Sequence, residues 1–318
     1  LKGFEEPQRI WQVIKPRSEQ TRFDASRGPV LTPMVDRIEA MATLLGAWDS
    51  AEHSHGRIVL MRGEPGIGKS RLTQELRDRL AGQPHMRLWF QCSPYFTNTA
   101  LFPFIDQLTR AAGFDLLDSP GERLTKLDQV LSLAVDDTSE SLPLIAALLS
   151  LLGSSERDDL SGLSAQRRKE KTLEALLAQF EGLSAKQPLL IIIEDLHWID
   201  PTSLELIDLL AQRIHAFPAL CVFTSRPGFS TTWAERDDFD VIELDHLNRG
   251  YGEDLIARVV GAKRMPKEVI KQIFERTDGV PLFVEEITKT LLESELLEER
   301  EDRYVLARPL PPGAIPSS

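Results

Sequence analysis

Two alternating patterns of hydrophobic and polar positions organise most of the chain. Short apolar runs, typical of strands, lie at residues 57–62, 87–92, 188–194, 220–225 and 241–244. The run at 188–194 is continuously apolar, which predicts a strand covered on both faces, as in a parallel sheet. Helical spacing fills the intervals between these runs, so the chain predicts an α/β fold with right-handed crossovers. The predicted helices cover residues 69–80, 101–112, 122–135, 142–152, 165–183 and 202–214.

The strand pattern stops after residue 247, and a smaller helical unit is predicted there. Helical patterns cover residues 252–260, 266–277 and 281–297. Two short strands at 296–306 predict a hairpin after the last helix. At the other end of the chain, an apolar strand at residues 10–14 precedes a polar linker.

Composition and charge narrow the function classes. The chain has 318 residues, with 37 Lys and Arg against 49 Asp and Glu, a formal net charge of −12. Phosphate neutralisation needs a surplus of Lys and Arg, so no direct nucleic-acid partner is expected.

Location is predicted from apolar runs and cysteines. No apolar run approaches the ~20 residues of a membrane span, and the start of the chain has no signal-peptide pattern. Cys92 and Cys221 are predicted to be buried thiols in a reducing compartment. We therefore expect a cytoplasmic protein without a membrane partner. The chain begins with Leu1 rather than Met, and we expect it to be a segment of a longer protein.

A glycine-rich segment carries the most specific chemistry. Residues 63–70 fit G-x-x-x-x-G-K-[ST], follow a predicted strand and open a predicted helix. In that context the loop N–H groups and the helix N-terminus point at phosphates, and the glycines allow close backbone approach. Lys69 is expected to reach the β- and γ-phosphates and Ser70 to hold Mg²⁺. The predicted nucleotide-binding residues here are Gly63, Glu64, Pro65, Gly66, Ile67, Gly68, Lys69, Ser70 and Arg71.

Two acids end the apolar run at 188–194. Glu194 and Asp195 match a Walker B segment, in which one acid joins the Mg²⁺ shell and a neighbouring group orients the attacking water. We assign Glu194 to the metal and Asp195 to water activation. The two roles can be exchanged, because the sequence does not show which carboxylate faces the phosphate.

Other polar residues near these motifs have competing interpretations. Arg226 follows the run at 220–225 and is predicted to contact the γ-phosphate, with an exposed loop arginine as the alternative. Asp200 is interpreted first as a helix N-cap and second as a group at the metal or phosphate. For His197 we expect polar or structural packing rather than catalysis. The basic residues 167–169 are interpreted as a solvated helix face with ion pairs at i,i+3 and i,i+4.

Together these motifs resemble the STAND class of AAA+-related P-loop NTPases over nearly the whole chain. The nearest resemblance is to the ATPase modules that follow class III adenylate or guanylate cyclase domains in bacterial signalling proteins. Similar modules occur in large LuxR-type regulators. The resemblance rests on the P-loop and on residues 91–95, 101–105, 194–201, 224–226 and 278–286, and residues 1–13 look like the last strand of a cyclase domain.

The resemblance implies an architecture and two further site residues. The fold would be a P-loop NTPase with a parallel sheet flanked by helices, followed by a small helical lid. Pro281 would lie near the adenine. The family's Val-Gly-Arg-Glu segment, which packs on the base, reads Val-Asp-Arg-Ile here, so Arg37 is kept while Asp36 and Ile38 differ. The implied domains are 1–28 (end of a cyclase-like domain and linker), 29–247 (NTPase), 248–298 (lid) and 299–318 (hairpin strand and linker).

The implied function is an ATP-binding regulatory switch that hydrolyses ATP slowly and adjoins a nucleotide cyclase. ATP or ADP and Mg²⁺ are the expected ligands. The expected partners are neighbouring cyclase-like and helical-repeat domains, together with a nucleotide-dependent oligomer. Two alternatives stay open: a nucleotide-gated interaction module without turnover, and the regulatory domain of a LuxR-type transcription activator.

Overall fold

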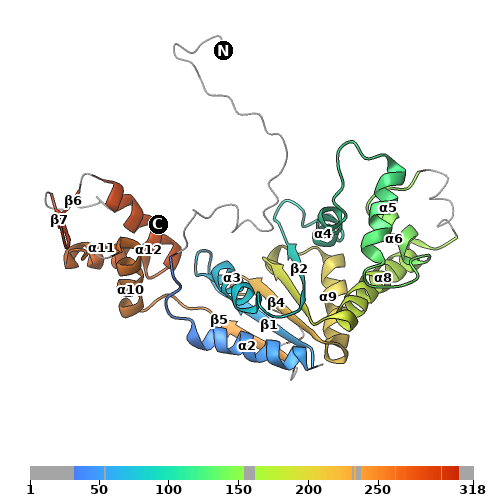
Figure 1. Cartoon of the computed structure of the whole chain (residues 1–318), viewed down its shortest axis with the longest axis horizontal. Coiled ribbons are helices and arrows are strands. Elements are labelled where there is room, and N and C mark those ends of the chain that lie inside the picture. Colours follow the sequence, from blue (N-terminus) through green and yellow to red (C-terminus); the bar gives the residue numbers. More distant parts are fainter. Residues whose placement is uncertain are drawn as a thin grey trace, which may run out of the picture. The chain divides into compact units, whose positions relative to one another are not determined.

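The computed structural model, drawn in Figure 1, describes residues 32–53, 55–153, 162–230, 233, 238–261, 263–294 and 296–307. The strand predicted at residues 10–14 and the cyclase-like interpretation of residues 1–13 lie outside these ranges. Within this part of the chain, no helix is both long and apolar enough to cross a membrane.

Five parallel strands form the central sheet, in the order β2-β3-β4-β1-β5. Every residue of β3 is buried, which explains its continuous apolar run and confirms the predicted parallel sheet. The register sets Arg62 of β1 beside Ser225 of β4, and Gln91 of β2 beside Glu194 of β3. The carboxyl ends of these strands therefore lie along one edge of the sheet. The strands are β1 Arg57–Arg62, β2 Met86–Gln91, β3 Leu189–Glu194, β4 Ala219–Ser225 and β5 Phe239–Glu243.

Alternate residues of the strands enter two separate hydrophobic cores. In β1, Ile58 and Leu60 belong to one core, whereas Val59 and Met61 belong to the other. Helices α4, α5, α6, α8 and α9 complete the first core, and α2 and α3 complete the second. The sheet is thus covered on both faces, as Figure 1 shows. The elements are α2 Ile38–Glu52, α3 Lys69–Leu80, α4 Phe102–Ala112, α5 Pro120–Leu131, α6 Ser141–Leu148, α8 Ala165–Lys186 and α9 Pro201–Arg213, with 3₁₀ turns η1 Leu196–Trp198 and η2 Ile214–Ala216.

Helix α2 is an element that the sequence patterns above do not predict. Its buried residues include Met41, Leu44 and Trp48, which repeat at three and four positions and form one helical face. The usual signal for a helix start is missing, because Arg37 caps the helix in a left-handed conformation without a side-chain hydrogen bond. The first helical residue, Ile38, is exposed. The apolar spacing therefore points to this helix, and no cap signal accompanies it.

Three helices and a hairpin form the unit that follows the sheet. Their apolar side chains make a third core, which includes Leu255, Ile273, Val284 and Leu297. The predicted hairpin is confirmed, and the helix predicted at 281–297 ends earlier because Leu297 belongs to a strand. The domain boundaries given above stay predictions. The elements are α10 Arg249–Val260, α11 Lys267–Thr277, α12 Pro281–Glu293, β6 Leu297–Glu299 and β7 Tyr304–Leu306.

Gly279 makes the tight connection between α11 and α12. Its φ of +75° lies in the left-handed region, and a Cβ at this position would lie 2.4 Å from the carbonyl oxygen of Leu247. The Leu247 N–H donates to the Gly279 carbonyl oxygen at 2.9 Å. Only glycine allows both the conformation and the close approach of the chain that leaves the sheet. This contact sets where α12 begins.

Gly279→Ala is predicted to destabilise the protein more than Gly113→Ala. Gly113 also has a positive φ, +59°, but open space surrounds its missing Cβ, so its substitution should cost only the left-handed penalty of about 1–2 kcal/mol. Gly279→Ala adds a clash with backbone, which should bring the loss to about 3 kcal/mol or more. Urea unfolding of the two variants measures the difference. Equal losses would show that the contact with Leu247 does not constrain the turn.

Candidate functional site

The glycine-rich loop connects β1 to α3 and has the backbone of an anion site. Gly66 and Gly68 adopt φ values of +79° and +106°, which side-chain-bearing residues rarely adopt. Helix α3 begins at Lys69 directly after the second of these glycines. The loop therefore sets the free N–H groups of a helix N-terminus beside those of a glycine turn, an arrangement that attracts phosphate.

The Lys69 side chain arches back over this loop. Its Nζ donates to the carbonyl oxygens of Gly63 at 2.7 Å and Glu64 at 2.9 Å. Burial lowers the pKa of Lys69, while Asp195 opposes that shift through its negative charge. The ammonium is thus held at the loop, within electrostatic reach of the acid that follows β3.

The two acids lie at the same sheet edge as the loop. Glu194 is the last residue of β3 and is buried, whereas Asp195 is partly exposed and has a φ of +58°. The Asp195 N–H donates to the Thr224 hydroxyl at 3.0 Å. In turn, the Gly63 N–H donates to the Ser225 carbonyl oxygen at 3.2 Å. Strand β4 therefore connects the acid-bearing strand to the loop through these two hydrogen bonds.

Arg226 and the η1 turn form the next part of this edge. Arg226 is exposed, and its guanidinium lies over the Trp198 ring, 5.6 Å from the centroid. That cation–π contact gives the arginine a defined direction. Next to it, the His197 and Trp198 rings are 5.0 Å apart. Burial lowers the pKa of His197, and the negative charge of Asp195 opposes this shift.

Asp200 is a helix N-cap, the first of its two predicted roles. It is buried, and its Oδ1 accepts from the N–H groups of Thr202 at 3.0 Å and Ser203 at 2.9 Å. The same oxygen accepts from the Leu101 N–H at 3.1 Å. The carboxylate therefore fixes the start of α9 and also holds the segment that enters α4.

The segment before α2 borders the loop from the other side. Arg37 donates from Nη2 to the carbonyl oxygens of Ile67 at 3.3 Å and Asp245 at 2.6 Å. Asp36 adopts a φ of +60°, so an aspartate here takes the left-handed conformation that glycine prefers. The guanidinium of Arg37 thus supports the loop through backbone oxygens, and its role at the base stays a prediction.

The helical unit reaches the glycine-rich loop at the start of α12. The Leu282 N–H donates to the Gly66 carbonyl oxygen at 3.2 Å. Pro281 occupies the first helical position and is partly exposed. A second link runs through His246, whose Nε2 lies 3.3 Å from a Glu64 carboxylate oxygen and whose Nδ1 lies 3.2 Å from one of Asp278. The loop and the helical unit are thus joined by a backbone hydrogen bond and by polar contacts of the His246 ring.

The predicted metal ligands have the right chemistry for Mg²⁺. Ser70 follows Lys69 in the first turn of α3, and Glu194 ends β3. Mg²⁺ prefers oxygen ligands and takes only one or two from a protein when phosphates and waters supply the others. The described residues contain no group of three His, Cys, Asp or Glu side chains placed to hold a metal. A hydroxyl and a carboxylate fit a shared phosphate–metal site better than a closed protein cage.

Other predicted residues are placed as follows. Arg71 lies within α3, where its Nη2 is 3.6 Å from a Glu75 carboxylate oxygen. Cys92 and Cys221 are free and buried, as predicted, and burial raises the pKa of both thiols. The structure therefore gathers the loop, Lys69, both acids and Arg226 at one edge, while Arg71 lies along the adjoining helix.

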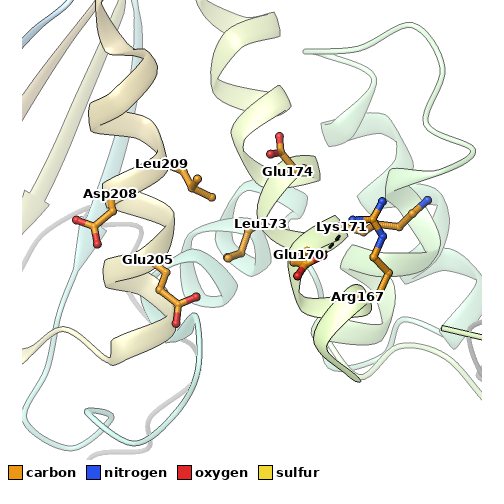
Figure 2. A pocket seen from close by; sticks show the side chains of 8 residues that line it. All are labelled: Arg167, Glu170, Lys171, Leu173, Glu174, Glu205, Asp208 and Leu209. Carbon is orange, nitrogen blue, oxygen red and sulfur yellow. Dashed lines mark hydrogen bonds and ion pairs between the residues drawn. The ribbon is translucent and has the colours of Figure 1, made fainter. Parts of the chain in front are cut away.

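A pocket of about 510 Å³ lies between α8 and α9 and shares no residue with the predicted nucleotide site (Figure 2). Its walls carry charged side chains that pair with one another, such as Arg167 with Glu170 at 3.0 Å. Lys169 on the same helix pairs with Glu205 of α9 at 2.6 Å. The Arg167 pair confirms the predicted i,i+3 pairing, whereas the Lys169 pair crosses to α9 instead of lying at i,i+4 on the same helix. The lining residues are Arg167, Glu170, Lys171, Leu173, Glu174, Glu205, Asp208 and Leu209.

Comparison with known proteins agrees with this geometry. The model of the AAA ATPase domain matches residues 33–223, and that of a domain of unknown function (DUF8739) matches residues 252–304. An uncharacterized protein of Rhizobium meliloti (strain 1021) is 30% identical over 291 residues, which are 90% of this chain and 28% of that protein. Adenylate cyclase type 10 of Rattus norvegicus is 23% identical over 241 residues, 74% of this chain and 15% of the cyclase. The chain thus spans less than a third of the length of either relative.

Among solved structures, a Signal Transduction ATPase with Numerous Domains (STAND) from Pyrococcus horikoshii, which carries a tetratricopeptide repeat sensor, is similar to this chain. The TM-score is 0.43 at 18% identity, and the match covers 86% of this chain and 31% of that one.

Glu285→Gln is predicted to raise the melting temperature at pH 8 but not at pH 4. Burial of Glu285 on α12 raises its pKa, with Lys289 opposing the shift. A carboxyl that ionises more readily in the unfolded chain than in the folded one makes folding less favourable as pH rises through both pKa values. The neutral amide removes that penalty. Below the unfolded pKa both forms are neutral, so the gain should vanish.

Glu286→Gln is the matched control. Glu286 neighbours Glu285, and both carboxylates lie near the Lys289 Nζ, at 3.1 Å for Glu286 and 3.7 Å for Glu285. The Glu286 side chain is 61% exposed, whereas the Glu285 side chain is only 28% exposed. Thermal denaturation at the two pH values compares the variants with the parent chain. The explanation by burial fails if both variants change the melting temperature alike or if the gain of Glu285→Gln persists at pH 4.

Proposed function

This chain belongs to the AAA ATPase domain family, and on that basis we propose that it binds ATP with Mg²⁺ and hydrolyses it slowly, as a regulatory switch. The observation that carries this proposal is the convergence on Lys69. Its ammonium bonds the glycine-rich loop and interacts electrostatically with Asp195, Arg226 and Glu194. Those are the charge types that phosphoryl transfer needs around a terminal phosphate.

Each residue then has a role in the proposed reaction. The N–H groups of residues 63–70 and the Lys69 ammonium bind the β- and γ-phosphates. Ser70 and Glu194 hold Mg²⁺, which when bound neutralises phosphate charge. Asp195 orients the attacking water and accepts its proton, and Arg226 stabilises the γ-phosphate charge.

The base site and the lid complete the proposed switch. Arg37 braces the loop on the side where the family resemblance puts the base, and Pro281 opens the helix that would cover the adenine. Leu282 already bonds the loop at Gly66. A change at the γ-phosphate that moves the loop would therefore move the start of α12, and the lid would carry the nucleotide state to neighbouring domains.

The proposed setting is a multidomain signalling protein in the cytoplasm. The chain matches 15% of an adenylate cyclase and 28% of a longer bacterial protein, which favours a module beside a nucleotide cyclase. Neighbouring cyclase-like and helical-repeat domains, and a nucleotide-dependent oligomer, are its proposed partners. The net charge of −12 favours no direct contact with nucleic acid.

Lys69→Ala is predicted to weaken ATP binding about thirtyfold or more, because a charge-assisted contact to phosphate contributes about 2 kcal/mol or more. The control is Lys171→Ala, on α8 and outside the site. Thermal shift with ATP, ADP or GTP, each with Mg²⁺, reports binding, since a ligand at ~100 times its Kd stabilises by ~2.7 kcal/mol. The proposal fails if none of these nucleotides stabilises the parent chain, or if both lysine variants bind ATP like the parent.

Asp195→Asn is predicted to keep ATP binding and to abolish phosphate release. Asparagine tolerates the left-handed φ of +58°, so the backbone should be preserved while the proton acceptor is lost. Glu194→Gln should instead raise the Mg²⁺ concentration needed for binding. Phosphate release and Mg²⁺ titrations separate the two, and exchanged outcomes would exchange the roles. Binding of ATP by the parent chain with no phosphate release would favour the nucleotide-gated module.

A further inference from the structure

His197 lies inside the charged cluster that the proposed mechanism uses, yet that mechanism gives it no task. It belongs to η1, directly after the acids of β3. Its ring interacts electrostatically with Asp195, Arg226 and Lys69. The imidazole therefore lies among the groups that would surround the terminal phosphate.

The ring nitrogens of His197 are the unusual feature. Nδ1 and Nε2 are both shielded from solvent, and neither has a hydrogen-bond partner within the described part of the chain. A buried polar atom left without a partner destabilises the folded state. A phenylalanine or leucine would fill the same space without that cost, so packing beside Trp198 does not account for an imidazole here.

Charge determines what the imidazole can bind. Burial favours the neutral ring, as do the nearby positive charges of Arg226 and Lys69, while the negative charge of Asp195 opposes them. A neutral imidazole has one N–H donor and one acceptor nitrogen. Beside an ammonium and a guanidinium, the ligand that matches the donor is an anion.

We propose that His197 is a specificity residue for the triphosphate, whose ring N–H donates a hydrogen bond to an oxygen of the γ-phosphate. This inference rests on the proposed ATP binding and deepens it. The residue would distinguish ATP from ADP, because only ATP brings an oxygen to this end of the site. It would act beside Arg226, which approaches from the next strand and is aligned by Trp198.

The test compares affinities for a non-hydrolysable ATP analogue and for ADP in three variants, measured by calorimetry with Mg²⁺. His197→Phe keeps a ring but removes both nitrogens, and we expect the analogue to bind about tenfold weaker or more while ADP affinity is unchanged. His197→Asn and His197→Gln each carry an amide nitrogen near the position of one ring nitrogen. One of the two should recover most of the analogue affinity.

The controls separate this inference from the proposed function. His215→Gln changes an exposed histidine on η2 and should leave both affinities unaltered. If the parent chain binds neither nucleotide, the proposed function fails. If the parent binds both, but all three His197 variants retain the parent ratio of the two affinities, His197 does not read the γ-phosphate and this inference alone is overturned. The Asn and Gln variants keep the question answerable if the Phe variant does not fold.

Discussion

The hydrogen bonding of β4 to its two neighbours is the constraint on which the site depends. Through Ser225 this strand accepts from the first glycine of the loop, and through Thr224 it accepts from the backbone of Asp195. Neither contact involves a ligand. Because parallel strands end together at one edge, two backbone N–H groups suffice to bring the loop and the acids within reach of each other. The two cores on either face of the sheet then keep that edge from shifting.

The helical unit contacts the same edge of the sheet, and glycine residues make this close contact possible. A Cβ on Gly66 would lie 3.0 Å from the Cβ of Leu282 and 3.2 Å from a Val280 methyl carbon. The absence of a side chain at Gly66 therefore leaves room for the contact between the loop and α12. Gly279 serves the other end of the connection by allowing Leu247 to pass. Gly66 in the loop and Gly279 in the helical unit thus determine how closely these two parts approach. His246 adds a polar link, because its ring contacts the carboxylates of both Glu64 and Asp278.

The sequence predicted the fold best where one physical signal dominated. A fully buried strand has to be apolar throughout, so β3 was found to within one residue, and the G-x-x-x-x-G-K-[ST] spacing identified β1, the loop and α3 together. Helix α2 was missed because its start has no cap signal. The bracing of the loop by Arg37 and the contact of Leu282 with Gly66 join residues 30 and more than 200 positions apart. Such contacts depend on tertiary packing, and the hydrophobic periodicity of a single segment carries no information about it. The same limit explains why the sequence did not indicate a role for His197. Its neighbours Lys69 and Arg226 lie on other segments of the chain, and their closeness follows from the strand order.

The acidic balance of the chain is compatible with a polyphosphate ligand because the relevant field is local. At physiological salt, charges separated by more than about 8 Å of solvent are largely screened, so acids spread over the surface scarcely act at the loop. Within the site, backbone N–H groups carry no net charge and still attract an anion. Lys69 and Arg226 supply the formal positive charge there. Arg37 adds less to it, because its guanidinium lies 3.7 Å from the Asp36 carboxylate, whose negative charge offsets it. The loop therefore attracts an anion mainly through the orientation of its backbone N–H groups, and the charges of Lys69 and Arg226 add to that attraction.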